Sequence, residues 1–436
     1  MISNSIAARN IFVLIYFFVS IYVCEGQNPP PASPQTKPVL LMNGIAHLGD
    51  GTVIQNSAIA FEDGKITIIA DATTVRLDMK LFDVINISGK HVYPGFIAAN
   101  TIIGLSEFEL VRSTNDFDEV GSLNPNIRSI IAYNTDSKVT PTVRSNGVLL
   151  AQITPTGGLI SGTSSVVELD AWNWEDAAFR TDDGIHLNWP SMMIDRVQKE
   201  KEKDEAKDRI EKSLLNLHDL FADAKAYSTL ANPSEHNLKF ESMRGLFNGS
   251  EKLYIHCEYT KEIISAVGFC KEFGVKMVLV GGADSWRITD LLRDNHIPVI
   301  LGRTHSLPQR EDEDADLPYK LPYLLKKAGV EFCLSVPGFW QVRNLPFNAG
   351  TAVGYGLTKE EALTAVSLSV AKILGVDAKV GSLEQGKEAT LFVSSGDALD
   401  MRTNDVELAF IQGKKINLDN IQKQLYKKYM EKYGLK

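Results

Sequence analysis

Four polar residues that follow short apolar runs could do chemistry together: two imidazoles, at His256 and His305, and two carboxylates, at Glu258 and Asp284. Two histidines and a carboxylate form a ligand set that can hold one divalent metal of the zinc type. Their spacing does not require a metal, and a hydrogen-bonded structural histidine is an equal alternative for His256. We therefore take His256 and His305 as candidate metal ligands, and Glu258 and Asp284 as candidate residues of a ligand pocket.

The elements that would position these residues are strand-like runs that alternate with amphipathic helical patterns after Pro94. The strand-like runs are Gly147–Ile153, Lys252–His256, Lys276–Val280, Pro298–Leu301 and Val330–Leu334. The helical patterns are Lys261–Phe273, Trp286–Asp294, Leu321–Ala328 and Lys359–Leu374. Such alternation predicts repeated βα units, arranged either as a barrel or as a doubly wound sheet. In a barrel the carboxyl ends of the strands face one mouth, so we expect His256 and His305 at the same mouth.

The two ends of the chain have a different texture from this middle part. From Val39 to His91, short β-rich runs are broken by turn dipeptides such as Asp63-Gly64, which predicts a small antiparallel sheet. Strand-like runs return near Thr390 and Val406, and Lys415–Lys436 forms a basic, partly amphipathic tail. In the middle part, Ser161–Asp170 is interpreted as a polar loop.

Several segments resemble the amidohydrolase superfamily, and within it the imidazolonepropionase-like branch. The segments are Gly89–Ile97, Asn126–Gly147, Gly158–Gly162, Asn344–Gly350 and Gly381–Leu391, in the family's order, within a resemblance that runs from about Val39 to Ile416. The resemblance implies an α/β chain: a TIM-type (β/α)8 barrel with a β-sandwich-like domain built from the N- and C-terminal segments. The expected organisation is a signal peptide (1–26), a linker (27–37), the first part of the β domain (38–93), the barrel (94–380), and the second part of the β domain with the tail (381–436).

Most of the metal-ligand positions of that superfamily are replaced in this sequence. Two histidines expected at the end of the first barrel strand are Asn100 and Ile102, and a histidine expected after the sixth strand is Gly281. The aspartate expected at the eighth strand, a general base in the family, is Val336 or Pro337. An asparagine offers only a neutral carbonyl oxygen and isoleucine offers no ligand atom, so the family's metal site would have to be rebuilt.

The one matching ligand position is His256, at the fifth strand. Asn100 joins Glu258 and Asp284 as a pocket candidate, because its amide would lie at the barrel mouth.

Two functions follow from the resemblance together with these replacements. The first is a hydrolase that acts on carbon–nitrogen bonds of cyclic amides or short peptide-like substrates, with a rebuilt site. The second is a catalytically inactive homologue that binds a small ligand or pairs with an active amidohydrolase relative, since a barrel keeps its fold without its mouth chemistry. One divalent metal and no cofactor at all are equally compatible with the sequence.

The net charge limits the class of partner that is expected, and the N-terminal segment indicates the cellular location. The formal net charge of −9 gives no basic footprint for phosphates, so a small-molecule ligand is expected and a nucleic acid is not. Arg9, the apolar stretch Ile11–Cys24 and the small residue Gly26 form a signal-peptide pattern that is too short to span a bilayer. We expect an exported protein, periplasmic or secreted, with no membrane contact in its mature form; a homo-oligomer is one possible assembly.

The remaining cysteines, Cys257, Cys270 and Cys333, lie in apolar stretches without framework spacing. They are expected as buried structural thiols.

Overall fold

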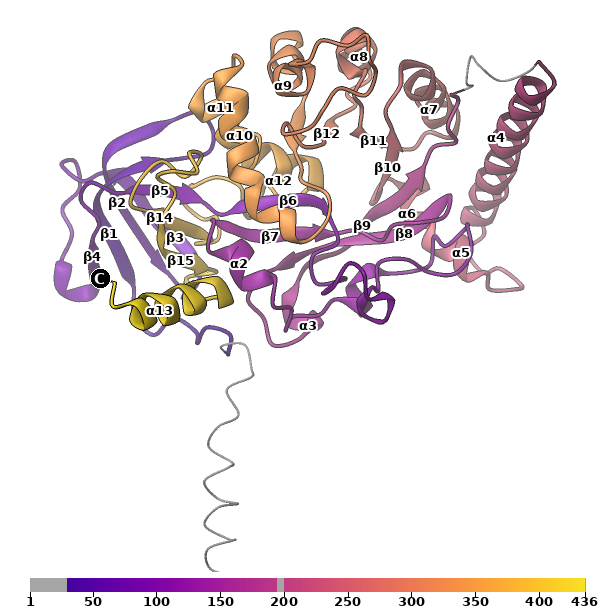
Figure 1. The fold of residues 1–436 in the computed structure, drawn as a ribbon. Coiled ribbons are helices and arrows are strands. Elements are labelled where there is room, and N and C mark those ends of the chain that lie inside the picture. The colour runs from indigo at the N-terminus through magenta and orange to yellow at the C-terminus, as the bar shows by residue number, and fades with distance from the viewer. Residues whose placement is uncertain (1–29, 194–199, 436) are drawn as a thin grey trace, which may run out of the picture. The chain divides into compact units, whose positions relative to one another are not determined.

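The computed structural model describes residues 30–193 and 200–435, and the described residues from Pro31 onward belong to one folded unit (Figure 1). The predicted signal peptide and residues 27–29 of the predicted linker lie outside the described residues. The rest of the linker has no helix or strand before Val39, but it contacts the folded unit. The Ala32 amide donates to Asp170 Oδ2 at 2.8 Å, and Gln35 Nε2 donates to the Phe61 carbonyl at 2.8 Å.

One sheet combines strands from both ends of the chain. Its order is β16-β15-β14-β5-β1-β2-β3, with β4 also paired to β1. The antiparallel pairing of β5 with β14 joins the two chain ends. The sheet was predicted to be antiparallel, but β1 runs parallel to β4 and β5. The strands are β1 (Val39–His47), β2 (Val53–Glu62), β3 (Lys65–Asp71), β4 (Asp83–Asn86), β5 (His91–Pro94), β14 (Leu391–Ser394), β15 (Val406–Ile411) and β16 (Lys414–Lys415).

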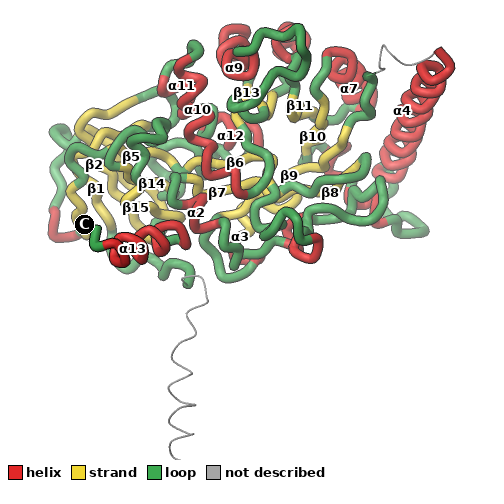
Figure 2. The backbone as a smooth tube through the Cα atoms, viewed as in Figure 1, coloured by secondary structure: helices red, strands yellow, loops and turns green. Residues whose placement is uncertain are grey.

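A second sheet of eight strands curves into a nearly closed barrel (Figure 2). Its order is β13-β12-β11-β10-β9-β8-β7-β6. The predicted α/β chain with a barrel sheet and a separate sheet is therefore confirmed at this level. The strands are β6 (Phe96–Thr101), β7 (Val148–Ile153), β8 (Ile160–Glu168), β9 (Ala178–Asn188), β10 (Lys252–Cys257), β11 (Met277–Gly281), β12 (Val299–Leu301) and β13 (Phe332–Leu334).

The barrel differs from eight regular βα repeats at β8, which runs antiparallel to both neighbours. The chain passes from Ile153 at the end of β7 to Ile160 at the start of β8 without a helix. A parallel crossover needs a dozen or more residues, so this short connection forces the antiparallel direction. The interpretation of Ser161–Asp170 as a loop was wrong for the same region, since Ile160–Glu168 is strand β8.

The ring closes between β13 and β6 through a break in a helix. The predicted helix Lys359–Leu374 is two helices, α11 (Lys359–Thr364) and α12 (Leu368–Leu374). Between them, the Ala365 carbonyl accepts from the Leu334 amide at 2.9 Å, and the Val366 carbonyl accepts from the Ile97 amide at 3.0 Å. The break frees two carbonyls that satisfy the edges of both strands, which explains why one continuous helix does not form.

The helices surround the barrel sheet, and α7, α9 and α12 pack directly against its strands. The long helix α4 begins at Glu200. None of the helices in the described residues is long and apolar enough to cross a membrane. Besides α11 and α12, the described helices are α2 (Thr140–Arg144), α3 (Trp174–Ala177), α4 (Glu200–Ser228), α5 (Leu238–Ser242), α6 (Arg244–Asn248), α7 (Thr260–Phe273), α8 (Thr289–Asp294), α9 (Leu317–Ala328), α10 (Leu345–Gly354) and α13 (Ile421–Tyr433). Short 3-10 turns are η1 (Met79–Leu81), η2 (Arg112–Thr114), η3 (Ser129–Ala132), η4 (Ser285–Arg287) and η5 (Trp340–Asn344).

Candidate functional site

A pair of histidines lies at the carboxyl end of two neighbouring barrel strands. His256, on β10, has its Nε2 atom 2.9 Å from Nδ1 of His186 on β9. Burial lowers the pKa of His256 to about 4 and lowers the pKa of His186 well below its ordinary value. Both rings are therefore neutral at pH 7, and one donates to the other. His186 Nε2 is buried and has no hydrogen-bond partner among the described residues.

A buried polar network lies beside this pair inside the barrel. The Tyr254 ring stacks on His186, with centroids 4.6 Å apart, and its hydroxyl donates to Asp183 Oδ2 at 2.6 Å. Gln152 Nε2 donates to the same carboxylate at 2.8 Å, and Ser164 Oγ donates to its Oδ1 atom at 2.8 Å. Burial raises the pKa of Asp183, while these three hydrogen bonds act in the opposite direction. The network joins strands β7, β8, β9 and β10.

The network also holds Asn100 at the end of the first barrel strand, one of two positions there where the resemblance implies a ligand. The Asn100 amide donates to Gln152 Oε1 at 3.0 Å, and Asn100 adopts a left-handed φ of 52°. The Ile102 amide donates to the Gly338 carbonyl at 3.1 Å. At the last strand, Val336 is buried, with 1% of its surface exposed. Ile102 and Val336 therefore offer only hydrocarbon side chains, whereas Asn100 offers an amide.

At Gly281, the last residue of β11, the carboxylate of Glu258 fills the space that a side chain would need. A Cβ atom at Gly281 would stand 2.3 Å from Glu258 Oε1, and Gly281 has a left-handed φ of 92°. The carboxylate is held there because Glu258 Oε2 accepts from the Ala283 amide at 2.9 Å. Burial raises the pKa of Glu258. No side chain fits at position 281 unless Glu258 moves.

Glu258 also lines a cavity of about 200 Å³ at the carboxyl ends of β10, β11 and β12. Arg303, Ser306 and Gln309 supply other polar groups of its lining, and Leu317 and Leu321 supply apolar ones. A buried carboxyl group can act as a proton acceptor or donor, and a guanidinium can stabilise developing negative charge. The cavity thus combines an acid–base group with a cation.

The other two predicted site residues are engaged elsewhere. Asp284 is buried and accepts from Arg310 Nη2 at 2.7 Å and from the Thr260 amide at 3.1 Å. Burial alone would raise the pKa of Asp284, but the hydrogen bonds from Arg310 and Thr260 lower it below its ordinary value. His305 is exposed, and its Nε2 atom lies 2.5 Å from Thr351 Oγ1. The structure brings Glu258 and Gly281 together, while His256 and His305 each bond to a different partner.

The donor set does not fit the divalent metal that the resemblance implies. Among residues 30–193 and 200–435, no group of three or more His, Cys, Asp or Glu side chains is placed to hold a metal ion. At the sixth-strand position the space for a ligand side chain is taken by Glu258. His256 Nε2 is bonded to His186. We therefore derive no step that passes through a metal.

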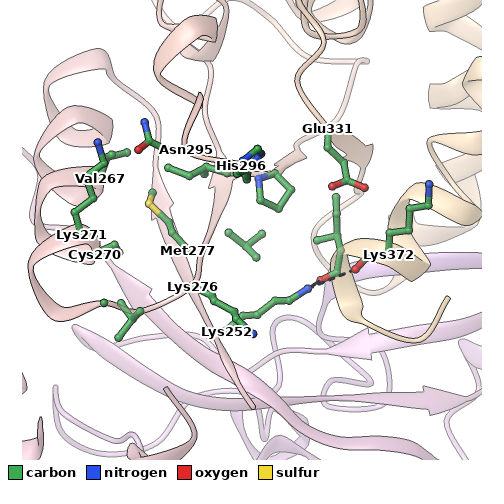
Figure 3. Close-up of a pocket in the computed structure, with 16 residues that line it drawn as sticks. Lys252, Val267, Cys270, Lys271, Lys276, Met277, Asn295, His296, Glu331 and Lys372 are labelled. Carbon is green, nitrogen blue, oxygen red and sulfur yellow. Dashed lines mark hydrogen bonds between the residues drawn. The ribbon is translucent and has the colours of Figure 1, made fainter. Parts of the chain in front are cut away.

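A larger cavity of about 480 Å³ lies at the opposite, amino-terminal ends of β10 to β13 (Figure 3). Lys252, Lys276, His296 and Glu331 line it. The amine of Lys252 donates to the Ile373 carbonyl in the last turn of α12, and that of Lys276 donates to the Gly249 carbonyl at 2.7 Å. These lysines cap orphan carbonyls, in keeping with the stabilising role of this barrel face.

Comparison with known structures identifies the architecture. An amidohydrolase from Thermotoga maritima MSB8 superimposes with a TM-score of 0.74 and 21% sequence identity, over 87% of this chain and 99% of that one. The chain has the amidohydrolase fold. A putative prolidase from Bifidobacterium longum shares this amidohydrolase fold with a TM-score of 0.52 and 15% identity, over 91% of this chain and 100% of that one.

Sequence comparison adds one shorter match. Amidohydrolase tasK from Hapsidospora irregularis is 32% identical over 114 residues, which is 24% of this chain and 12% of that protein. The matched part therefore spans about an eighth of that relative's length. No family model matches the chain.

His186 and Asp183 were not predicted as site residues, because the strand that carries them, β9, was not predicted. The signal was present: residues 184–188 alternate small or polar with apolar side chains, Gly-Ile-His-Leu-Asn, as a strand with one apolar face does. Because β9 was not predicted, no hydrogen-bond partner could be predicted for His256. The buried state predicted for Cys257, Cys270 and Cys333 is confirmed.

Proposed function

We propose that the protein is an exported hydrolase of the amidohydrolase superfamily, from its imidazolonepropionase-like branch, that acts on carbon–nitrogen bonds of cyclic or short peptide-like amides. The observation that carries the proposal is the cavity whose lining includes both Glu258 and Arg303, at the strand ends where barrel enzymes keep their active sites. The amidohydrolase and prolidase names of structures with the same fold support the choice of bond.

In this proposal the reaction uses acid–base groups of the protein. Glu258 takes a proton from water as the water attacks the amide carbonyl, and then gives a proton to the leaving nitrogen. Burial raises the pKa of Glu258, which favours the protonated form that gives a proton to the leaving nitrogen. Arg303 stabilises the negative charge that develops on the carbonyl oxygen. A cavity of about 200 Å³ admits the reacting part of a small molecule.

The second candidate is a non-catalytic homologue that binds a small ligand or an active relative. The observation that favours it is the loss of ligand groups at Ile102, Gly281 and Val336, with Glu258 filling the place of one of them. A superfamily barrel keeps its core when its mouth chemistry is lost.

The deciding experiment measures hydrolysis of a panel of dipeptides and cyclic amides, with metal content determined on the same preparation. We expect turnover by the wild type and a loss of about 100-fold or more in Glu258→Gln. The matched control is Glu272→Gln on the exposed surface of α7, which should keep wild-type turnover. No turnover with any substrate, with or without added zinc or manganese, would support the second candidate.

Export is a proposal that rests on the N-terminal pattern Arg9, Ile11–Cys24 and Gly26. It places the mature protein in a periplasm or outside the cell. Fractionation of cells that express the full chain tests it, with processed protein expected in the exported fraction. Full-length protein that stays in the cytoplasm would contradict it.

A further inference from the structure

The C-terminal helix α13 is attached to the folded unit by its first turn. Asn420 caps the helix by accepting from the Lys423 amide at 2.9 Å, and its Nδ2 donates to Ser145 Oγ at 3.0 Å. Gln422 Oε1 accepts from Thr142 Oγ1 at 2.7 Å. Beyond this turn no residue of α13 is buried. The helix therefore presents most of its surface outward (Figure 1).

The exposed surface of α13 is amphipathic, with large apolar and aromatic side chains on one side. At 100° per residue, positions four apart fall on one stripe, and Tyr426 lies next to that stripe. Tyr426 is 65% exposed and Tyr433 is 64% exposed, fractions unusual for large aromatic side chains. The stripe consists of Ile421, Leu425, Tyr429 and Tyr433, all of them exposed.

Lysines border this stripe on both sides. Lys428 and Lys432 lie four residues apart on one border and Lys423 lies on the other, while Lys427 lies on the opposite face of the helix. The Lys432 amine lies 5.2 Å from the centre of the Tyr433 ring, so its stem covers part of the aromatic surface. The segment 414–435 has six lysines (414, 415, 423, 427, 428, 432) against Asp419 and Glu431, in a chain whose formal net charge is −9.

We propose that α13 docks the protein on an anionic lipid surface. An exposed apolar stripe with tyrosines, bordered by lysines, is the form of helix that lies in the plane of a membrane interface. Local positive charge on an acidic protein selects a negative partner, and each lysine near an anionic leaflet adds attraction. The contact is peripheral, and it replaces the earlier expectation of no membrane contact in the mature form.

The test is co-sedimentation of the full chain with vesicles of phosphatidylcholine alone or mixed with phosphatidylglycerol. We expect binding to the mixed vesicles that weakens as salt rises, and at least tenfold weaker binding to phosphatidylcholine alone. Substitution of Lys423, Lys427, Lys428 and Lys432 by Gln should weaken binding to the mixed vesicles at least tenfold. The matched control removes the same number of lysines elsewhere (Lys80, Lys201, Lys212 and Lys327), and it should bind as the wild type does.

Three outcomes would overturn the proposal. One is equal binding to both kinds of vesicle, which would point to the apolar stretch Ile11–Cys24 as the anchor. Another is unchanged binding after the four lysines of α13 are replaced. The third is a dimer that dissociates when Tyr426 and Tyr429 are changed to Ser while no vesicle binding is seen, which would make a second copy of the chain the occupant of this face.

Discussion

Strands β9 and β10 carry two polar clusters of opposite character, one closed and one open. In the closed cluster, each oxygen of Asp183 accepts hydrogen bonds from neighbouring strands, and the donors are fully buried. In the open cluster, which follows the end of β10, Glu258 borders a cavity beside Gly281. Groups whose hydrogen bonds are all made inside the protein stabilise the barrel, whereas groups with unused capacity at the mouth are available to a ligand.

The largest expected effect comes from opening the closed cluster. Asp183→Ala leaves the Tyr254 hydroxyl, the Gln152 amide and Ser164 without their shared acceptor, so we expect the free energy of unfolding to fall by about 4 kcal/mol. Urea denaturation measures the change. The adjacent Asp182→Asn is the control, because Asn tolerates the left-handed φ of 51° at this position and the pair with the exposed Arg128 contributes roughly 0–1 kcal/mol. Equal losses in the two variants would remove the distinction between the clusters.

The second effect is a loss of stability in acid that originates in the histidine pair. The pKa of folded His256 is about 4, below its ordinary value of 6.5. A lowered histidine pKa means that the unfolded chain binds the proton more readily, so this stability is complete above about pH 6.5 and is lost as pH falls toward 4. The shift corresponds to about 3 kcal/mol for His256.

Urea midpoints at pH 7 and pH 5 test this sign. The wild type should lose stability at pH 5, and His256→Gln should lose clearly less. His218→Gln is the control, because a hydrogen bond to Glu272 raises the pKa of the exposed His218, which gives the opposite dependence on pH. An identical acid loss in His256→Gln and the wild type would show that the histidine pair is not its source.

The smallest of the three effects concerns the filled strand end at the open cluster. Gly281→Ala places a Cβ atom against the Glu258 carboxylate in a left-handed backbone position, and we expect a cost of about 2 kcal/mol. Gly302→Ala is the control, since Gly302 lines the same cavity and has no atom within 4 Å of the added Cβ. In a Glu258→Ala background the cost at Gly281 should fall, leaving only the backbone strain. An undiminished cost in that background would mean that the carboxylate does not occupy this space.

Much of the fold was predictable because local patterns decide it. The runs Lys252–His256 and Lys276–Val280 became β10 and β11, and Lys261–Phe273 became α7 within a residue. These elements are apolar with clear ends, such as the left-handed Gly274 that ends α7. Strand β9 was not predicted although residues 184–188 carry a local alternating pattern. The break between α11 and α12 was not predicted because it depends on ring closure, which lies outside any short window of sequence.

The candidate site was predictable only in part. Type and position in the chain were enough to single out His256 and Glu258. Their partners, His186 and the place left by Gly281, depend on which strands are neighbours, a fact set by contacts between residues far apart in the chain. Asp284 was also a reasonable carboxylate candidate, but the fold pairs it with Arg310, 26 residues further along the chain.

The sequence by itself determined the alternation of strands and helices, the acidic net charge, and the residue types at Asn100, Ile102 and Val336. Residue type alone settles what an atom can donate or accept, so these conclusions need no coordinates. Only the tertiary structure decided that His256 bonds to a buried histidine and that Glu258 fills the space beside Gly281. Both facts are distances between side chains on different strands, and they exist only once the barrel has closed.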